Sequence, residues 1–294
     1  MVTAVSSGTN IDVNGLVSQL MAAERAPLAA LQRTQAGFQA KISAYGRLQS
    51  SLAAVGDAAR KLDATDAFRA ARATVSDPAV LGANASAGAG RGTYSVEVQT
   101  LAQAQKLASP AFLAADSVVG TGTLTIQFGG FDSGTSTFTA NGVRPALNLT
   151  IDAGNNTVAG VRDAINATNG GVRASIVNDG GGFRLALAAA DGGTANTLKI
   201  TTTDDDGANT DVAGLSRLAF DPAATAGAGK NLTQNAAGQD AVLFIDGIRV
   251  TKSSNTISDA IAGLTLNLSK SNLGSPVTVG VVPERVAVTA TPPP

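Results

Sequence analysis

Residues 10–62 read "NIDVNGLVSQLMAAERAPLAALQRTQAGFQAKISAYGRLQSSLAAVGDAARKL", and their apolar side chains recur at the spacing of one helix face. From residue 28 onward the apolar positions mostly alternate steps of three and four, with one skipped turn: Leu28, Leu31, Phe38, Ile42, Tyr45, Leu48, Leu52, Val55 and Leu62. This spacing predicts the seam of a long helix of the coiled-coil type. Because such a helix gains its stability by burying its apolar stripe, we expect it to need a partner.

The beginning of this helix carries two further signals. Asn10 or Asp12 can cap it, and Val13, Val17 and Leu20 begin its apolar face. Pro27 removes an amide donor and clashes with the preceding turn, so it predicts a kink or break between a short first helix and a longer second one. Residues 1–9 are small and polar, and we expect them to be disordered until docked.

The spacing alone leaves two interpretations of the helix open. It is either an assembly helix that packs against neighbouring subunits or a stalk paired within its own chain. The helix also carries the basic residues Arg25, Arg33, Lys41, Arg47, Arg60 and Lys61. They could complement an acidic partner surface, but we favour the interpretation that they form an ordinary solvated helix face.

After a connector spanning residues 63–92, the period of the apolar residues changes to two, which is typical of strands. The alternating sets, separated by Gly, Asn and Asp clusters, are Tyr94, Val96 and Val98; Leu124, Ile126 and Phe128; Leu147, Leu149 and Ile151; Phe183, Leu185 and Leu187; Leu198 and Ile200; Leu264, Leu266 and Leu268; and Val277, Val279 and Val281. The pattern predicts a mainly antiparallel β body. The fold class is therefore α+β.

Two short segments within the β body carry a helical pattern. Residues 155–165 place Val158, Val161 and Ile165 on one face behind a Thr157 cap, and residues 254–264 repeat the N-T-[VI] start and the D-A-I element. We expect a β–α–β packing unit used twice. Asp246-Gly247, between two apolar runs, predicts a two-residue hairpin turn.

Composition excludes several classes of chemistry. Zero cysteine and zero histidine among 294 residues exclude thiolate catalysis, cysteine or histidine metal ligands and His-based triads. A formal net charge of -1 argues against a nucleic-acid partner, and no apolar run is long enough for membrane insertion. The first residues lack the pattern of a cleavable signal peptide.

For the remaining candidate metal, phosphate and catalytic sites we favour a structural interpretation. Asp204, Asp205 and Asp206 lack the alternating ligand spacing of a calcium loop and are read as a solvated loop. Residues 178–183 and 87–92 are Gly-rich but lack a phosphate-binding context, so they predict turns. Because the acidic residues are scattered and aromatic residues are few, we do not favour hydrolysis of glycosides by a pair of carboxylates. We expect no catalytic residue, no metal and no cofactor.

Five blocks together resemble the flagellar hook-associated protein 2 family of filament-capping proteins. They are "GTNIDVNGLVSQLMAAERAPLAALQ" (8–32), "ISAYGRLQSSL" (42–52), "GTYSVEVQTLAQAQKL" (92–107), "TIDAGNNTVAGVRDAINATNGGVRASIVNDGGGFRLAL" (150–187) and "QDAVLFIDGIRVTKSSNTISDAIAGLTLNL" (239–268). The fourth block resembles the flagellin hook IN motif. The resemblance implies a non-enzymatic, extracellular cap at the tip of the bacterial flagellum, exported without a cleavable signal peptide, that promotes folding and insertion of flagellin.

The resemblance also implies partners and an architecture. Expected partners are further copies of the chain in a ring, flagellin, hook-filament junction proteins and a flagellar export chaperone. The expected domains are a helical leg (1–66), a discontinuous β-rich head (67–127 and 234–282), an inserted β-rich head (128–233) and a tail (283–294). The family's long C-terminal helical region, which returns along the N-terminal helix, is not expected here.

The expected assembly interface lies on the leg helix. Its residues are Leu16, Leu20, Leu28, Leu31, Phe38, Ile42, Tyr45, Leu48 and Leu52. We expect this helix to be under-packed in the isolated chain and ordered only on assembly. In the inserted head, 144–151 and the helix carrying Val158, Val161 and Ile165 are expected to pack in the core. The alternative function is a surface adhesin that binds host glycans through the head domains.

Overall fold

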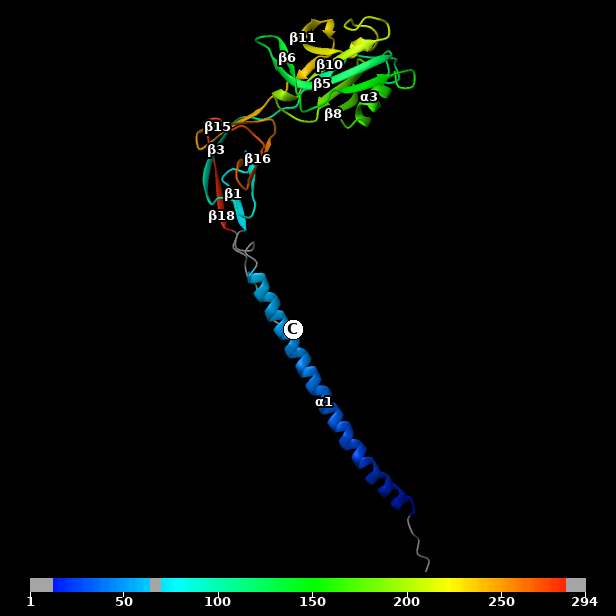
Figure 1. Ribbon diagram of the computed structural model, residues 1–294, viewed down its shortest axis with the longest axis vertical. Helices are drawn as coiled ribbons and strands as arrows, with labels where there is room; N and C mark the ends of the chain where they lie inside the picture. The colour runs from blue at the N-terminus through cyan, green and yellow to red at the C-terminus, as the bar shows by residue number, and fades with distance from the viewer. Residues whose placement is uncertain (1–12, 64–69, 284–294) are drawn as a thin grey trace, which may run out of the picture. The chain divides into compact units, whose positions relative to one another are not determined.

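A computed structural model describes residues 13–63 and 70–283 of the chain (Figure 1). The chain divides into two compact units, Met1–Phe68 and Arg69–Pro294, which are described separately below. The first unit is helical and the second is built mainly of antiparallel strands, so the predicted α+β class is confirmed. The predicted cap at Asn10 or Asp12, the N-terminal residues 1–9 and the tail beyond residue 283 lie outside the described residues.

The first unit contains one helix, α1 (Val13–Asp63), of 51 residues (Figure 1). Of the predicted kink or break at Pro27, the break is wrong, because one helix continues through this residue, and the kink stays a prediction. Proline removes one amide donor and crowds the preceding turn. The surrounding sequence is rich in Ala, Leu, Gln and Arg, which are strong helix formers, and it carries the helix across the single interruption.

The second unit is a succession of strands with one α-helix among its described residues. Its elements are β1 (Ala71–Val75), β2 (Leu81–Ala85), β3 (Gly92–Thr100), β4 (Lys106–Ala108), β5 (Gly122–Asp132), β6 (Thr137–Ala140), β7 (Leu147–Ile151), α3 (Val158–Ala167), β8 (Val172–Asn178), β9 (Phe183–Ala189), η1 (Thr194–Asn196), β10 (Thr197–Asp204), η2 (Gly214–Leu218), β11 (Phe220–Ala226), β12 (Ala228–Lys230), β13 (Thr233–Ala236), β14 (Ala241–Ile245), β15 (Ile248–Lys252), β16 (Thr256–Ile261), β17 (Leu264–Leu268) and β18 (Val277–Pro283).

One hydrophobic core of this unit lies between a five-stranded and a three-stranded sheet. The first sheet has the order β1-β18-β3-β14-β15 and the second the order β16-β17-β2, with every neighbouring pair antiparallel. Val96, Val98, Leu243 and Val279 are fully buried in this core. Strands from the two ends of the body therefore close one sheet, with β18 between β1 and β3.

A second core is formed by the residues between those strands. A six-stranded sheet contains β12-β11-β10-β5-β6 with β7 paired to β5, and a four-stranded sheet has the order β13-β4-β9-β8. α3 packs against them through Val158, Val161 and Ile165, all fully buried. Thr157 caps this helix as predicted, because its Oγ1 accepts a hydrogen bond from the Gly160 amide at 3.1 Å.

The period-two segments all form strands, so those predictions are confirmed. They correspond to β3, β5, β7, β9, β10, β17 and β18. The hairpin at Asp246-Gly247 is also confirmed: Ile245 pairs with Ile248, and both turn residues have positive φ. Positive φ at both central positions is the requirement of a type I′ turn, which suits Asp-Gly.

The predicted second helix, residues 254–264, is wrong. This segment forms β16 and the turn into β17, with Ile257 paired to Leu266 and Ile261 to Leu264. Ile257, Ile261 and Leu264 fit a helical spacing equally well. A single helical turn is costly to nucleate, whereas β17 is already paired with β2 and offers a free edge to extend. The β–α–β unit is therefore not used twice.

The predicted connector before the β body also proves to contain structure. Within residues 63–92, β1 pairs with β18 and β2 pairs with β17. Both strands are short and rich in Ala, so they give little alternation signal along the sequence. Their pairing depends on partners about two hundred residues away in the chain.

Two antiparallel connectors join the two cores. Gln103 and Gln239 exchange backbone hydrogen bonds at 2.8 and 2.9 Å. The Asp240 carboxylate accepts from the Thr194 amide at 3.0 Å and from the Thr194 hydroxyl at 2.7 Å. The Asn255 side chain pairs with both backbone groups of Ala102. The junction is thus held by a network of directional bonds rather than by apolar packing.

The residues of the two cores indicate where the β body divides into domains. The domain boundaries themselves stay a prediction. Residues of the first core end at Ala102 and resume at Ala241, whereas the second core spans Leu107 to Leu232. The predicted boundary between residues 127 and 128 falls inside β5. We propose instead that the inserted domain begins between Ala102 and Leu107, because a strand and its sheet belong to one core.

Candidate assembly interface

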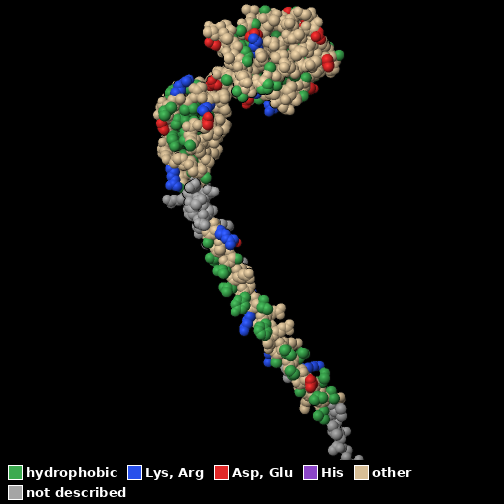
Figure 2. Space-filling view, in the orientation of Figure 1, with side chains coloured by type: hydrophobic (Ala, Val, Ile, Leu, Met, Phe, Trp, Pro, Cys, Tyr) green, Lys and Arg blue, Asp and Glu red, His purple; other side chains and the backbone are tan. Residues whose placement is uncertain are grey.

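The nine predicted interface residues all lie on α1, and their side chains are exposed. Each is between 57% and 71% exposed: Leu16, Leu20, Leu28, Leu31, Phe38, Ile42, Tyr45, Leu48 and Leu52. Water-exposed side chains of this size on one element are unfavourable unless another surface covers them. Figure 2 shows the hydrophobic side chains following one another along the helix.

Three further exposed residues belong to the same surface and were absent from the predicted interface. Val17, Met21 and Val55 are 53%, 49% and 64% exposed. Val17 and Val55 belong to the apolar spacing described above, and Met21 follows Val17 by four residues, so the spacing indicates all three. We call these twelve side chains together the α1 stripe. At about 1.5 Å per residue, it runs for roughly 60 Å along the helix.

The charged side chains of α1 that the structure describes lie in solvent. Arg25, Arg33, Lys41 and Arg47 are exposed, in agreement with a solvated helix face. Arg60 lies 3.5 Å from Asp57, and both side chains are largely exposed. Exposed pairs of this kind contribute little, on the order of 0–1 kcal/mol. The helix therefore presents an apolar stripe beside a basic and well-hydrated face.

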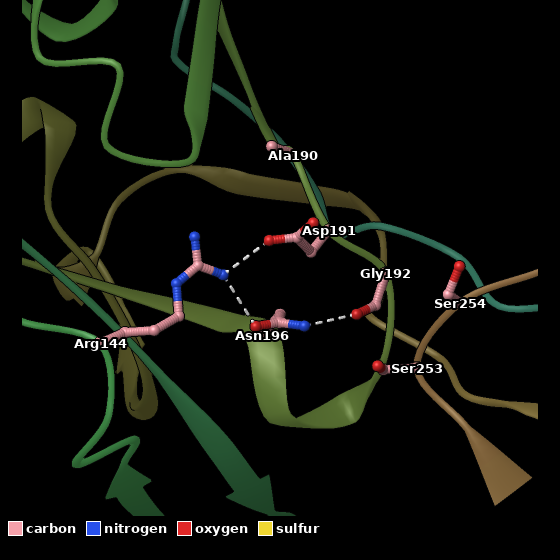
Figure 3. A pocket seen from close by; sticks show the side chains of 7 residues that line it. All are labelled: Arg144, Ala190, Asp191, Gly192, Asn196, Ser253 and Ser254. Atoms are coloured by element: carbon pink, nitrogen blue, oxygen red, sulfur yellow. Dashed lines mark hydrogen bonds and ion pairs between the residues drawn. The ribbon is translucent and has the colours of Figure 1, made fainter. Parts of the chain in front are cut away.

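A polar pocket in the second unit is lined in part by Arg144, Asp191 and Asn196 (Figure 3). Arg144 Nη1 donates to Asp191 Oδ2 and to Asn196 Oδ1, each at 3.0 Å. Its guanidinium also lies 3.8 Å from the centre of the Phe128 ring. The pocket is completed by backbone and by Ser253 and Ser254. Arg144 is thus engaged in fastening the 141–146 loop to the chain between β9 and β10, which is a structural role.

The aspartates at 204–206 do not form a simple solvated loop. Asp204 is buried, and its Oδ2 accepts from the Ser216 amide at 2.8 Å. The Asp206 amide lies 3.4 Å from Asp204 Oδ1. The carboxylate therefore anchors η2 against the end of β10, and the solvated interpretation is wrong for Asp204. Among the described residues, no group of three or more acidic, His or Cys side chains is arranged to hold a metal ion.

The Gly-rich segment 178–183 is the β8–β9 turn, as predicted. Gly180 and Gly182 have positive φ, and the Asp179 amide donates to the Gly182 carbonyl at 3.1 Å. In the part of the chain that the structure covers, no helix combines the length and the hydropathy needed to cross a bilayer.

Two family models match the chain. The family model for the flagellar hook-associated protein 2 N-terminus matches residues 9–105, and that for the flagellar hook-associated protein 2 C-terminus matches residues 238–290. The B-type flagellar hook-associated protein 2 of Pseudomonas aeruginosa is 33% identical over 278 residues, which is 92% of this chain and 54% of that protein.

The chain belongs to the flagellar hook-associated protein 2 family.

A second curated member, from Escherichia coli O157:H7, is 32% identical over 267 residues, which is 88% of this chain and 51% of that protein. The chain spans about half the length of these curated members of the hook-associated protein 2 family. The two matched regions of the family flank residues 106–237, which contain the second core. Both the match and the cores therefore favour an insertion at the same points.

Solved structures of the hook-associated protein 2 family agree with the fold. The crystal structure of the flagellar cap protein FliD D1-D2-D3 domains from Escherichia coli has a TM-score of 0.64 at 31% identity, covering 82% of this chain and 63% of that one. FliD (HAP2) from Pseudomonas aeruginosa has a TM-score of 0.55 at 31% identity, covering 71% and 87% respectively. The names of these relatives refer to the flagellar cap and hook, and they lend no support to the adhesin alternative.

Proposed function

We propose that this chain is a non-enzymatic subunit of the cap at the tip of a bacterial flagellar filament. The observation that carries the proposal is the α1 stripe on an uninterrupted helix of 51 residues, in a chain of the hook-associated protein 2 family. A stripe of this length suits docking onto other helices. The β body is held by two closed cores and needs no such partner.

Apolar burial supplies the driving force for this docking. A large aliphatic or aromatic side chain contributes about 1.5–3 kcal/mol when it passes from full exposure to burial. Twelve half-exposed side chains on one stripe therefore offset the cost of ordering and bringing together two or more helices. The same stripe in an isolated chain is a liability, because it favours aggregation.

The mechanism we propose is geometric. Copies of the chain surround the filament end, with α1 against helices of the filament and the β bodies above the site where flagellin folds and inserts. The proposed partners are other copies of this chain, flagellin, hook-filament junction proteins and a flagellar export chaperone. The proposed location is extracellular, at the flagellum tip.

The test is the binding of the purified chain to sheared flagellar filaments of the same organism. Gold-labelled chain is added and the filaments are viewed by electron microscopy. We expect label at one filament end. The double variant Phe38→Ser with Ile42→Ser, which removes two large side chains from the α1 stripe, is expected to lose most of this end label.

A matched control changes an exposed apolar residue outside α1. Leu113 is 96% exposed in a loop of the β body, so Leu113→Ser leaves the stripe intact and should retain end labelling. Label distributed along the filament shaft, or end label that is insensitive to the stripe variant, would argue against the proposed function.

A further inference from the structure

Asn141 and Gly142 begin a tight turn in the loop between β6 and β7. The Arg144 amide donates to the Asn141 carbonyl at 3.1 Å, and neither Gly142 nor Val143 has a positive φ, as in a type I turn. The Asn141 side chain folds over this turn, because its Oδ1 accepts a hydrogen bond from the Val143 amide at 3.0 Å. Such an Asx turn brings the side-chain carbonyl carbon, Cγ, close to the Gly142 amide nitrogen.

An Asn-Gly pair in this conformation can react with itself, and Asn is among the thermolabile residues of proteins. The Gly142 amide gives its proton to a solvent base, and its nitrogen attacks Asn141 Cγ, so that a C–N bond forms. The side-chain amide nitrogen takes up a proton and leaves as ammonia, and a cyclic succinimide results. Water then adds to one of the two imide carbonyls and breaks one C–N bond, which gives an aspartate or an isoaspartate.

Two features of the turn favour the first step of this reaction. Negative charge develops on Asn141 Oδ1 as the nitrogen attacks, and the Val143 amide already donates to this oxygen, as a donor of an oxyanion hole does. The Gly142 amide donates no hydrogen bond among the described residues, so no bond has to break before it reacts. Gly142 is exposed and Asn141 is half-buried, so water and a solvent base can reach the pair.

The same dipeptide occurs at Asn14-Gly15 in α1 and at Asn169-Gly170 in the turn between α3 and β8. The Gly170 amide donates to Thr168 Oγ1 at 3.1 Å, and this bond must break before the Gly170 nitrogen can attack. Within the described part of the chain, no hydrogen bond is donated to Asn169 Oδ1. Asn169 therefore lacks both features and serves as a comparison within the same β body.

We propose that Asn141 is a site of spontaneous deamidation in the folded chain. Water is the co-reactant, and ammonia is the second product. The modification adds one negative charge to the loop that joins β6 to β7. It needs no enzyme, because the nucleophile, the reacting carbonyl and the activating amide all belong to the same turn.

The isoaspartate product changes the loop that carries Arg144. Its backbone runs through Cγ, so one methylene group is inserted between β6 and β7, and the former Asn141 carbonyl becomes a free carboxylate. This carbonyl is the acceptor of the Arg144 amide. Arg144 fastens the loop through its bonds to Asp191 and Asn196 (Figure 3). The lengthened backbone weakens this fastening.

The test compares Asn141 with Asn169 in the full chain. The chain is incubated at mildly alkaline pH, folded or unfolded in guanidinium chloride, and peptide mass spectrometry measures the rate of conversion at each residue. We expect Asn141 to convert at least as fast in the folded chain as in the unfolded one, and at least roughly tenfold faster than Asn169 in the folded chain. Equal rates at the two residues in the folded chain, or slower conversion of Asn141 on folding, would overturn the proposal.

Substitutions of Gly142 test the role of its nitrogen. The Cβ of Gly142→Ala meets no atom within 4 Å, so the fold is retained, and we expect the methyl group to slow conversion at Asn141 by roughly tenfold. Gly142→Pro suits the second position of a type I turn and has no amide hydrogen, so it should abolish the conversion. Circular dichroism verifies that both variants fold. Conversion of Asn141 at the unmodified rate in either folded variant would overturn the mechanism.

The effect on the loop is measured on the modified chains themselves. Ion exchange separates them, because each carries an additional negative charge, and peptide analysis identifies those with isoaspartate at residue 141. We expect their melting temperature to lie below that of the unmodified chain. Gly142→Ala incubated for the same time is the control and should keep its melting temperature. Equal melting temperatures of the isoaspartate and unmodified chains would overturn the effect on the Arg144 loop.

Discussion

Gly193 shows how a single residue controls the junction between the two cores. Its φ is 95°, in the region that favours glycine, and a Cβ at this position would lie 2.7 Å from Asp240 Oδ1 and 2.5 Å from Ser253 Cβ. Asp240 is the carboxylate that holds Thr194. The junction therefore needs a residue without a side chain at this point.

We expect Gly193→Ala to destabilise the β body by about 1–3 kcal/mol, because it adds both backbone strain and a steric clash. Chemical denaturation followed by circular dichroism measures this change. Gly130→Ala is the control, since Gly130 has no positive φ and no atom within 4 Å of the added Cβ. Equal stability of the two variants would contradict the role assigned to Gly193.

Asp179 provides a pH-dependent contact at the β8–β9 turn. The hydrogen bond from the Arg184 side chain, assisted by the Gly181 amide, lowers the pKa of the Asp179 carboxyl below its ordinary value. A lowered folded-state pKa means that the contact stabilises the fold fully above the unfolded pKa, about 3.9, and is lost as pH falls through the lower folded value.

The replacement Asp179→Asn should therefore reduce thermal stability more at pH 7 than at pH 2.5. At the lower pH the unmodified carboxyl is itself becoming protonated, so the two chains converge. Melting temperatures of both chains across this range provide the measurement. A constant difference at every pH would exclude the proposed contribution of this carboxylate.

At the scale of elements, α1 and the β16–β17 hairpin show the limits of local patterns. Helical spacing correctly predicted α1, in which more than ten turns repeat the same signal. It failed for residues 254–264, where three apolar residues fit a helix and a hairpin alike. The length of the segment decides between these cases. A long segment with helical spacing is compatible with few structures other than a helix, whereas the structure of a short segment depends on the strand edge with which it can pair.

Pro27 lowers the stability of α1 around this residue, but the helix continues through it. We expect Pro27→Ala to stabilise the helix by up to about 3 kcal/mol around this residue, because an amide donor is restored and the clash removed. Circular dichroism at 222 nm of the dilute chain should show increased helicity. The melting temperature of the β body should not change, and unchanged helicity would mean that Pro27 costs α1 nothing.

At the scale of the whole molecule, stability is divided unequally between the two units. The β body has two buried cores, whereas the twelve side chains of the α1 stripe are exposed. A single helix in water is marginal, so its amides open readily. We therefore expect α1 to become protected only when the stripe is covered.

Hydrogen exchange as a function of concentration measures this protection. In dilute monomer, amides of residues 28–52 should exchange much faster than those of β3 and β18, the central strands of one sheet. At concentrations where copies associate and cover the α1 stripe, protection of residues 28–52 should rise. Strong protection of this segment in a verified monomer would contradict the expectation that α1 is under-packed alone.

The sequence by itself determined the class of the fold, the face of α1 that carries the exposed apolar side chains and the strands with clear alternation. These features are local: a helix repeats every 3.6 residues and a strand every two, so the side chains that share a face can be read along the chain. The family of the chain was also visible in five sequence blocks, and comparison confirmed it.

Only the tertiary structure decided the remaining features. The weak strands β1 and β2, the hairpin at 254–264 and the buried Asp204 all depend on contacts with other segments of the chain. The same holds for the backbone bonds between Gln103 and Gln239 and for the bonds from Thr194 to Asp240. Such contacts leave no periodic trace, because pairing energy comes from the facing strand or loop rather than from the segment's own residues. For α1 the structure shows which of the regularly spaced apolar side chains are exposed.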